Sequence, residues 1–282
     1  ISLLESGLDW LEERTNKKVF GVLPYLHGFH LEAEDSVKID QLVDHSQQVI
    51  NIVVPVFPHI SNHTDLDALR LHPQVNLHYV ATDMEKPAAD LIILPGSKNV
   101  QGDLHWLKQQ GWHGHINKHL RYGGKLIGIC GGYQMLGNKL HDPHGIEGTV
   151  ASIDGLALLD FETTIEKQKQ LEHVNGHFIT DKAKVSGYEI HMGISQGPAL
   201  DKPAIQLADK TDGVISDDNQ IIGTYLHGLF DLPSALTSLL NWAGLNEASQ
   251  FDYAALREEE LDRLANEMEA NININQILDK SY

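Results

Sequence analysis

The sequence lacks most of what secreted, membrane-spanning and nucleic-acid-binding proteins rely on. It holds one cysteine in 282 residues, so it cannot form an internal disulfide. No apolar run approaches the roughly 20 residues that span a bilayer, and no signal peptide is visible. Lysine and arginine number 21 against 39 aspartates and glutamates, and the net charge of −18 repels phosphate backbones and anionic lipids. We therefore expect a cytoplasmic protein with neither nucleic-acid nor membrane partners.

The N-terminal residues differ in character from the rest of the chain. The apolar spacing of residues 3–13 predicts a helix, and the short run 18–26, which Pro24 interrupts, predicts a buried strand. Residues 27–46 are polar and are expected to form a linker. The chain begins with Ile1 rather than methionine, which we interpret as the start of a fragment whose N-terminal part is absent.

From residue 47 onward, predicted strands and helices alternate. Short apolar runs predict buried strands at 49–57, 76–80, 90–96 and 125–129. Helices are expected over 99–122, over 133–137 and after Thr64, where T-D-L-D is typical of a helix cap. This alternation predicts an α/β fold with a mostly parallel sheet covered by helices on both faces.

The pattern changes after residue 150. Shorter strands are predicted at 184–193, 204–209, 213–216 and 220–228, the last two flanking a turn. Helix returns from residue 232, and the apolar spacing of residues 251–279 predicts two surface helices packed on a core.

The single cysteine lies in K-L-I-G-I-C-G-G-Y-Q-M-L-G (125–137). Cys130 follows an apolar strand and precedes Gly131 and Gly132, where a helix is expected. A nucleophile on such a turn is exposed at the carboxyl edge of the sheet, where α/β proteins bind ligands. The helix N-terminus lowers a thiol's pKa there, and free backbone N–H groups can stabilise an oxyanion. The alternative, that Cys130 is a small core residue, is disfavoured by the two glycines.

A thiol nucleophile needs a base, and the sequence offers 17 histidines. His227 stands out because it ends the apolar run I-I-G-T-Y-L-H-G (221–228), again at the carboxyl end of a predicted strand. The clustered His113, His115 and His119 lack the ligand spacing of a zinc site, so no metal is predicted.

Several blocks occur in the order found in one known family. They are I-S-N-H-T-D-L-D-A-L (60–69), L-P-G-S-K-N-V-Q-G-D-L-H-W-L (94–107), G-I-C-G-G-Y-Q (128–134), S-G-Y-E-I-H-M-G (186–193) and G-T-Y-L-H-G-L-F-D (223–231). Together they resemble the glutaminase domain of class I glutamine amidotransferases, most closely that of the cobyric acid synthase family of cobalamin biosynthesis. Residues 3–26 and 251–265 resemble the end of that family's N-terminal synthetase domain and its C-terminal tail.

This resemblance implies a fold and a division of the chain. The fold is a flavodoxin-like class I glutaminase domain, expected over residues 47–245. Residues 1–46 would be the end of an N-terminal synthetase domain with a linker, and residues 246–282 a C-terminal helical tail.

The resemblance also implies roles for individual residues. Cys130 would attack the side-chain amide of glutamine, and His227 would activate the thiol and then protonate the leaving ammonia. The residues implied to hold the substrate or its oxyanion are Gly96, Ser97, Gly131, Gln134, Tyr188, Glu189 and His191. For Tyr188, Glu189 and His191, ordinary alternating strand positions are an equally good interpretation.

One departure concerns the group that orients the histidine. Most class I glutaminases carry H-x-E, in which the glutamate orients the base. Here the third position is Leu229. The cobyric acid synthase type predicts this absence and leaves the orienting group open, with Glu189 as a candidate substitute.

The cofactors and the acceptor are expected outside this chain, which contains no G-x-x-x-x-G-K-[ST] phosphate loop. The resemblance implies no cofactor here and places ATP and Mg on the missing synthetase domain. There, ATP would activate carboxylates of the corrinoid acceptor, adenosylcobyrinic acid a,c-diamide, for amidation with ammonia from glutamine.

Three other functions fit part of the pattern. A glutaminase subunit that amidates peptidoglycan precursors has a similar nucleophile motif but does not explain residues 1–46 or the tail. A cysteine peptidase or another hydrolase would use the same Cys–His pair. A non-catalytic module descended from such an enzyme is disfavoured by the intact Cys130 and His227.

Overall fold

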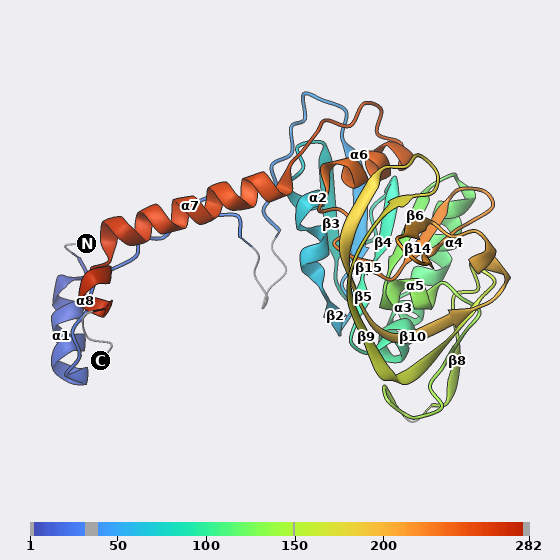
Figure 1. Cartoon of the computed structure of the whole chain (residues 1–282), viewed down its shortest axis with the longest axis horizontal. Coiled ribbons are helices and arrows are strands. Elements are labelled where there is room, and N and C mark those ends of the chain that lie inside the picture. The colour runs from blue at the N-terminus through green and yellow to red at the C-terminus, as the bar shows by residue number, and fades with distance from the viewer. Residues whose placement is uncertain (1–2, 32–38, 149, 279–282) are drawn as a thin grey trace. The chain divides into compact units, whose positions relative to one another are not determined.

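The computed structural model describes residues 3–31, 39–148 and 150–278. The chain forms two compact units, a large one of Ala33–Tyr253 and a small one of Ile1–Glu32 with Ala254–Tyr282 (Figure 1). The predicted linker at 27–46 lies partly outside the described residues, and its described parts contain neither helix nor strand.

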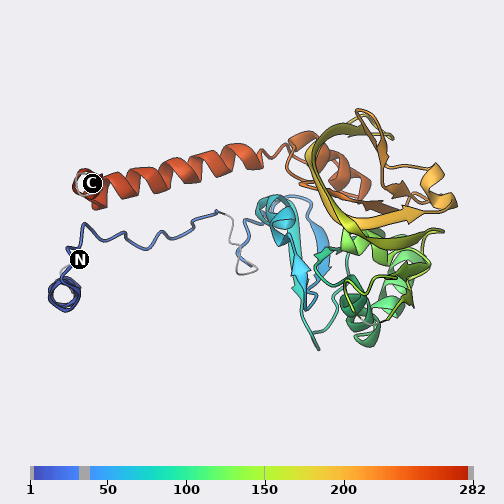
Figure 2. The same ribbon diagram turned by 60° about the horizontal axis from the view of Figure 1, so that its bottom comes forward.

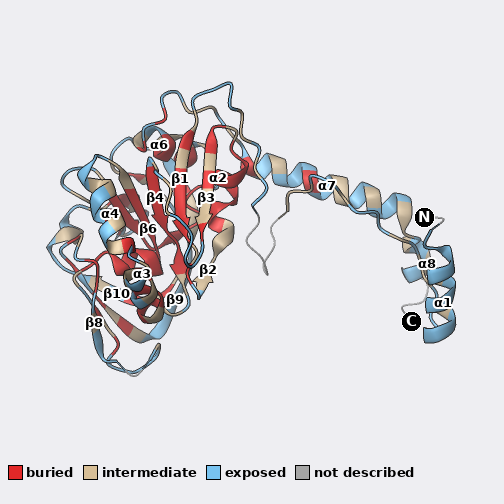
Figure 3. Ribbon diagram, turned by 180° about the vertical axis from the view of Figure 1, so that it is seen from behind, coloured by how far each residue is buried: buried red, intermediate tan, exposed pale blue. Residues whose placement is uncertain are grey.

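The small unit contains the predicted helices but not the predicted strand. Its helices are α1 (Glu5–Thr15), nearly all of α7 (Tyr253–Asn271), and α8 (Ile274–Leu278). The strand expected at 18–26 is wrong: only Gly21 makes an isolated bridge, to Ile272, and Tyr25 is 83% exposed. Among the described residues of this unit, no strand lies beside the run to form a ladder with it. Within this unit, the described residues of α8 bury no side chain and α7 is largely exposed (Figure 3).

The large unit is built on a six-stranded sheet in the order β13-β14-β6-β4-β1-β3. The strands are β1 (Ile50–Pro55), β3 (Val75–Val80), β4 (Leu91–Leu94), β6 (Lys125–Ile129), β13 (Val214–Ile215) and β14 (Ile221–Thr224). Five run parallel and β13 is antiparallel to β14. Because the central strands are buried on both faces, their sequences are apolar runs, and this is why they could be predicted (Figure 3).

Helices follow the parallel strands, as the alternation predicts. They are α2 (Asp67–Leu71), α3 (Val100–Gln109), α4 (Trp112–Arg121), α5 (Gly131–Met135) and α6 (Pro233–Trp242). The connections β1-to-β3 and β4-to-β6 cross the sheet in opposite directions, so right-handed crossovers place α2 and the α3–α4 pair on opposite faces. The helix expected over 99–122 is interrupted near Gly111, which has φ +73° and precedes α4.

The helix expected after Thr64 begins differently from the prediction. The segment His63–Leu66 is a 3₁₀ turn, η1, and α2 follows it without a side-chain cap. Asp67, expected to complete the cap, instead accepts a hydrogen bond from Arg70 Nε at 2.8 Å. The 3₁₀ turn matters because it carries Asp65, which is buried.

A second sheet, mostly antiparallel, has the order β12-β11-β9-β10-β15, with β7 paired to β9 and β8 to β7. Its strands are β7 (Lys139–His141), β8 (Ser152–Asp154), β9 (Glu162–Phe178), β10 (Lys184–Gln196), β11 (Ile205–Leu207), β12 (Thr211–Asp212) and β15 (Leu226–His227). A 3₁₀ turn, η2 (Pro198–Asp201), follows β10. Figure 2 shows the long, curved ribbons of β9 and β10. The sequence did not indicate β9, because residues 166–173 are mostly polar and exposed. Residues 170–173 pair with β10 through the backbone, and the register shifts across residues 166–169.

Two features of the topology position the site. The chain passes from β14 of the first sheet almost directly into β15 of the second, where Tyr188 of β10 pairs with His227. A short antiparallel pair, β2 (Ile60–Ser61) and β5 (Gly96–Ser97), joins the loops that follow β1 and β4. Among the described residues, no helix is both long and apolar enough to span a membrane.

Candidate active site

Cys130, Gly96 and His227 lie at the carboxyl ends of adjacent strands. Cys130 follows β6, Gly96 comes two residues after the last residue of β4, and His227 lies three residues beyond β14. Since β14, β6 and β4 are neighbours in the sheet, the three segments meet at one edge. This is the edge at which open α/β sheets bind ligands.

The Cys130 backbone has a conformation that a residue with a side chain rarely adopts. Its φ is +49° and its ψ −107°, and it immediately precedes the first turn of α5. The two glycines that follow allow a close approach: a Cβ on Gly132 would lie 2.1 Å from the Leu94 carbonyl oxygen, and one on Gly131 would lie 2.9 Å from the Ser97 nitrogen. The turn is therefore strained at the cysteine and packed tightly against β4 and β5.

His227 is held by Asp65, a residue that the sequence did not single out. The ring Nδ1 donates to Asp65 Oδ2 at 2.6 Å, and the Gly228 N–H donates to Asp65 Oδ1 at 3.0 Å. His227 and Asp65 are both buried. The remaining ring nitrogen is left for the Cys130 thiol, which contributes to the raised pKa of His227. The thiol of Cys130, the imidazole of His227 and the carboxylate of Asp65 thus have the arrangement that a nucleophile, its base and an orienting group require.

The pKa of His227 is strongly perturbed. Burial alone would lower the pKa, but the hydrogen bonds to Asp65 and Cys130, with the charges of both groups, outweigh burial and raise the pKa to about 10. The ring therefore carries its proton at neutral pH. Tyr188 stacks on it with ring centroids 5.2 Å apart, and the Tyr188 hydroxyl accepts a hydrogen bond from Asn62 Nδ2 at 2.9 Å.

The suggestion that Glu189 orients His227 is wrong. The Glu189 carboxylate accepts a hydrogen bond from Lys210 Nζ at 2.6 Å and lies 3.9 Å from His191 Nε2. Burial alone would raise the pKa of Glu189. The hydrogen bonds and charges of His191 and Lys210 outweigh burial, so the pKa is lowered. The alternation of β10 explains the error, because Tyr188 and Glu189 point to opposite sides of the strand and only Tyr188 stacks on His227.

A cavity of about 290 Å³ opens beside Cys130. Six of the sequence-predicted residues line it: Ser97, Cys130, Gly131, Gln134, His191 and His227. Gly96, Tyr188 and Glu189 are not among the residues that line it. Tyr188 supports His227 instead, and Gly96 lies so close to the histidine that a Cβ there would come within 3.3 Å of its Cε1 atom.

The same cavity has charged residues at its rim that the sequence did not indicate. Lys98, Lys169 and Glu147 line it, and Glu147 is its only carboxylate among the described residues. Glu147 accepts a hydrogen bond from the Gln101 N–H at 3.0 Å, and Asp142 accepts from the Glu147 N–H at 2.8 Å. Burial is the main reason that the pKa of Glu147 is raised.

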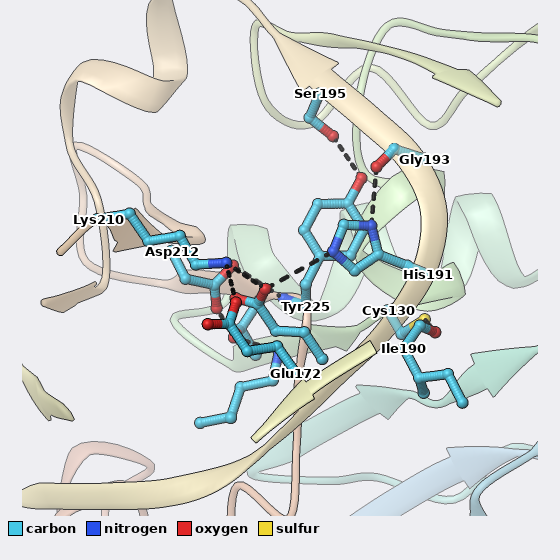
Figure 4. A network of polar contacts seen from close by, with 12 residues as sticks. Cys130, Glu172, Ile190, His191, Gly193, Ser195, Lys210, Asp212 and Tyr225 are labelled. Atoms are coloured by element: carbon cyan, nitrogen blue, oxygen red, sulfur yellow. Dashed lines mark hydrogen bonds and ion pairs between the residues drawn. The ribbon is translucent and has the colours of Figure 1, made fainter. Parts of the chain in front are cut away.

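His191 belongs to a network of polar contacts with Gly193, Tyr225 and Ser195 (Figure 4), which Gln134 joins through Tyr225. His191 Nδ1 donates to the Gly193 carbonyl at 2.8 Å, and its ring stacks on Tyr225 with centroids 3.8 Å apart. The Tyr225 hydroxyl hydrogen-bonds Ser195 Oγ at 2.8 Å and is the acceptor for Gln134 Nε2 at 3.5 Å. These contacts hold two cavity-lining side chains in one orientation.

The backbone N–H groups needed for an oxyanion also meet here. Gly131 is the first residue of α5, and the first N–H groups of a helix have no partner within it. The Ser97 nitrogen lies close to Gly131, as the crowding of a Cβ at that glycine shows. Among the described residues, no group of three or more His, Cys, Asp or Glu side chains is arranged to hold a metal ion.

The arrangement can therefore carry out acyl transfer, because it combines a thiol, a protonated histidine oriented by a carboxylate, and two N–H groups at one edge of a cavity.

Comparison with known proteins agrees with this chemistry. Residues 51–235 match the CobB/CobQ-like glutamine amidotransferase domain. A chain of the PurLQS structure from Thermotoga maritima has a TM-score of 0.53 and 16% identity over 69% of this chain and 99% of its own.

A second solved structure, a glutamine amidotransferase, has a TM-score of 0.51 and 16% identity over 68% of this chain and 98% of its own. At 16% identity, these two structural similarities support the fold only. That fold is the flavodoxin-like fold of class I glutamine amidotransferases. The match over 51–235 covers most of the chain and includes Cys130, His227 and Asp65. The chain belongs to the CobB/CobQ-like glutamine amidotransferase family and is a glutamine-hydrolysing amidotransferase.

Proposed function

We propose that Cys130 is the nucleophile that hydrolyses glutamine, with His227 as its acid and base. The observation that carries this proposal is the Cys130–His227–Asp65 chain at the carboxyl edge of the sheet, in which Asp65 holds the ring at 2.6 Å. The proposal also rests on the strained φ of +49° at Cys130, since such strain occurs at functional turns.

The first half of the reaction releases ammonia. The Cys130 thiolate attacks the carboxamide carbon of glutamine, and the electron pair of the C=O bond moves to oxygen. The N–H groups of Gly131 and Ser97 hold that oxyanion. When the C=O bond re-forms, the C–N bond breaks, and protonated His227 gives its proton to the leaving nitrogen. The product is a γ-glutamyl thioester with free ammonia.

The second half regenerates the thiol. His227, now neutral at the ring nitrogen facing Cys130, takes a proton from water, whose oxygen attacks the thioester carbon. The same two N–H groups hold the second oxyanion. Its collapse breaks the C–S bond, releases glutamate and restores the thiolate beside protonated His227. Asp65 holds the ring in one tautomer throughout, as the orienting member of such a chain must.

The charges at the rim suit a free amino acid. We assign Glu147 to the α-ammonium group of glutamine, because it is a cavity-lining carboxylate fixed in place by Gln101 and Asp142. Lys169 or Lys98 would face the α-carboxylate. Gln134, held by Tyr225, would hydrogen-bond the substrate along its length.

For the whole enzyme we propose the cobyric acid synthase reaction, in which ammonia from this site amidates carboxylates of adenosylcobyrinic acid a,c-diamide. ATP and Mg would bind a synthetase domain, since this sequence has no phosphate loop. The support is the family match together with the resemblance of residues 3–26 and 251–265 to the regions that flank the glutaminase domain in that family. We propose the cytoplasm as its location.

A glutamine-analogue electrophile and mass spectrometry test the site. Because Cys130 is the only thiol, one adduct on that residue is expected, and Cys130→Ser should remain folded without releasing ammonia from glutamine. Full activity in Cys130→Ser would overturn the assignment.

The acceptor is tested by supplying the synthetase domain, ATP, Mg and either the corrinoid or a lipid-linked peptidoglycan precursor. Amidation of the precursor alone would overturn the corrinoid role and leave the glutaminase in place.

A further inference from the structure

The carboxylate of Asp103 is buried close to the catalytic cavity and has no part in the chemistry above. Asp103 lies in the first turns of α3 and is 0% exposed. Its Oδ2 accepts a hydrogen bond from Ser97 Oγ at 2.5 Å. Its Oδ1 accepts from His59 twice, from the backbone N–H at 3.2 Å and from ring Nδ1 at 2.9 Å. A buried carboxylate is costly unless it is paired in this way.

These bonds connect the loops that follow β1 and β4. His59 lies just before β2, and Ser97 is the last residue of β5. The two loops are also joined through the backbone, where the Lys98 N–H donates to the His59 carbonyl at 2.9 Å. Ser97 Oγ in turn accepts a hydrogen bond from the Asn99 N–H at 3.0 Å. Ser97 is therefore held through its side chain, and the peptide N–H that follows it is bound to His59.

The antiparallel pairing of β2 with β5 determines the direction of the Ser97 N–H. The bond from Lys98 to His59 makes the Ile60–Ser97 pair a non-hydrogen-bonded pair of the antiparallel ladder. In such a pair the N–H groups point away from the partner strand, so the Ser97 N–H points away from β2. The Ser97 nitrogen lies close to Gly131, so the N–H groups of Ser97 and Gly131 can donate to the same oxyanion.

Capping of α3 does not account for Asp103. Asn99 already caps this helix, its side chain accepting a hydrogen bond from the Gly102 N–H at 2.9 Å. The Asp103 carboxylate instead reaches back beyond the helix to Ser97 and across to His59.

We propose that Asp103 is a positioning residue for the oxyanion site: by binding Ser97 and His59 together, it sets the Ser97 N–H at the place where charge develops. This inference rests on the proposed function, because it assumes that Cys130 forms a tetrahedral intermediate in this cavity. Asp103 touches neither substrate nor thiol and acts through the Ser97 backbone. Its loss should therefore affect stabilisation of the oxyanion and leave the nucleophile intact.

The variants are Asp103→Asn, Ser97→Ala, His59→Ala and His59→Asn in the full chain. Asparagine at 103 cannot accept with its NH₂ group, so at least one of the Ser97 and His59 donors loses its partner. His59→Asn keeps a side-chain donor near the position of Nδ1, whereas His59→Ala does not. Asp90→Asn is the matched control, because Asp90 Oδ2 also accepts a backbone N–H, that of Asn51 at 2.8 Å, but at the other end of β4.

Three readouts separate the oxyanion site from the nucleophile. Steady-state ammonia release gives kcat and KM for glutamine. Alkylation by iodoacetamide reports Cys130 alone, since the chain has no other thiol and alkylation develops no oxyanion. Inhibition by glutamate γ-semialdehyde reports the oxyanion site, because addition of the thiol to the aldehyde leaves a tetrahedral carbon bearing that oxygen.

We expect Asp103→Asn and Ser97→Ala to lower kcat about ten-fold or more and to weaken aldehyde inhibition in parallel, with KM and alkylation close to wild type. His59→Asn should retain more activity than His59→Ala, and Asp90→Asn should resemble wild type. If Asp103→Asn fails to fold, Ser97→Ala and the His59 pair carry the test. Unchanged kcat in these variants, or equal losses of kcat and alkylation, would overturn the inference. A wild-type chain that releases no ammonia, or an active Cys130→Ser, would instead overturn the proposed function.

Discussion

The ring Nδ1 of His227 lies 2.6 Å from Oδ2 of Asp65, although 162 residues separate the two in the sequence. Asp65 Oδ1 also accepts the Gly228 N–H, so one carboxylate holds both the ring and the turn that follows it. Leu229, where most class I glutaminases place their glutamate, is fully buried. The orienting carboxylate therefore comes from the loop after β1 instead of the position two residues after the histidine.

Replacing Asp65 with asparagine should impair the glutaminase severely. Asparagine can accept through one atom only, and its NH₂ group can favour the wrong tautomer of His227. We expect kcat for glutamine hydrolysis to fall by about 10²-fold or more, with a smaller change in KM. Steady-state ammonia release measures both values.

Glu189→Gln is the control for Asp65→Asn. Glu189 is also a buried carboxylate, but it binds Lys210 and lies near His191 rather than His227. Its removal should leave the pH profile of kcat unchanged. A large loss with a shifted pH profile in Glu189→Gln, together with mild effects of Asp65→Asn, would contradict the orienting role of Asp65.

The raised pKa of His227 predicts how stability depends on pH. The folded pKa is about 10, whereas an unfolded histidine titrates near 6.5. The stabilisation is fully present below about pH 6.5, where both states are protonated. Between the two values the folded state binds a proton that the unfolded state lacks, so the free energy of unfolding falls as pH rises and the contribution is lost near pH 10.

Urea unfolding of the wild type and His227→Gln at several pH values between 6 and 10 measures this contribution. The difference in unfolding free energy between the two proteins should shrink steadily across that range. In a Cys130→Ser background the decline should be smaller, because Cys130 contributes part of the rise in pKa. Differences that stay constant with pH would show that the folded pKa of His227 is not raised.

That Cys130 and His227 lie at the same edge of the sheet could be predicted, because each follows an apolar strand and the carboxyl ends of neighbouring parallel strands meet. Asp65 could not be predicted, because it lies on a 3₁₀ turn within a segment whose pattern is typical of an ordinary helix start. Its relation to His227 depends on the order of β1, β4, β6 and β14 in the sheet, which the local pattern does not contain. The only indication of Asp65 in the sequence was its place among the polar residues that flank the strands, and a single sequence contains many such residues.

The same limit applies to the second sheet and the small unit. Residues 166–173 of β9 carry no alternation of apolar side chains, because that part of the strand is exposed. Its residues 170–173 pair with β10 through the backbone, which the sequence pattern does not reveal. Residues 18–26 present the opposite case, since the run is apolar but forms no ladder with any strand in the described part of the chain. Apolar periodicity reports burial, and it predicts strands only where burial and pairing coincide.

Glu147→Gln should change the choice of substrate more than the chemistry. If Glu147 binds the α-ammonium group, its loss removes a charged hydrogen bond, and KM for L-glutamine should rise about ten-fold or more with kcat nearly unchanged. N-acetyl-L-glutamine has no α-ammonium group, so its hydrolysis should be poor in the wild type and little altered in the variant. Kinetics with both substrates test the assignment.

Glu162→Gln is a suitable control for Glu147→Gln. Glu162 pairs with His141 at 2.9 Å, and its side chain is about half exposed and outside the cavity lining. Its substitution should leave both substrates unaffected. Equal losses on L-glutamine and N-acetyl-L-glutamine in Glu147→Gln would mean that Glu147 supports the loop and does not contact the α-ammonium group.

The strained turn predicts that the side chain of Cys130 lowers the stability of the protein. Cys130 has φ +49° and ψ −107°, a region that glycine enters freely and residues with a Cβ enter at a cost of about 1–3 kcal/mol. Cys130→Gly removes this strain, while Cys130→Ala keeps it and loses only the sulfur atom. The extra chain entropy of an unfolded glycine, about 0.5–1 kcal/mol, offsets part of the gain. We therefore expect Cys130→Gly to be more stable than Cys130→Ala by about 1 kcal/mol, although neither can hydrolyse glutamine. Urea midpoints at equal m-values measure the difference, and a Cys130→Ala protein as stable as Cys130→Gly would show that the turn relaxes and stores no strain.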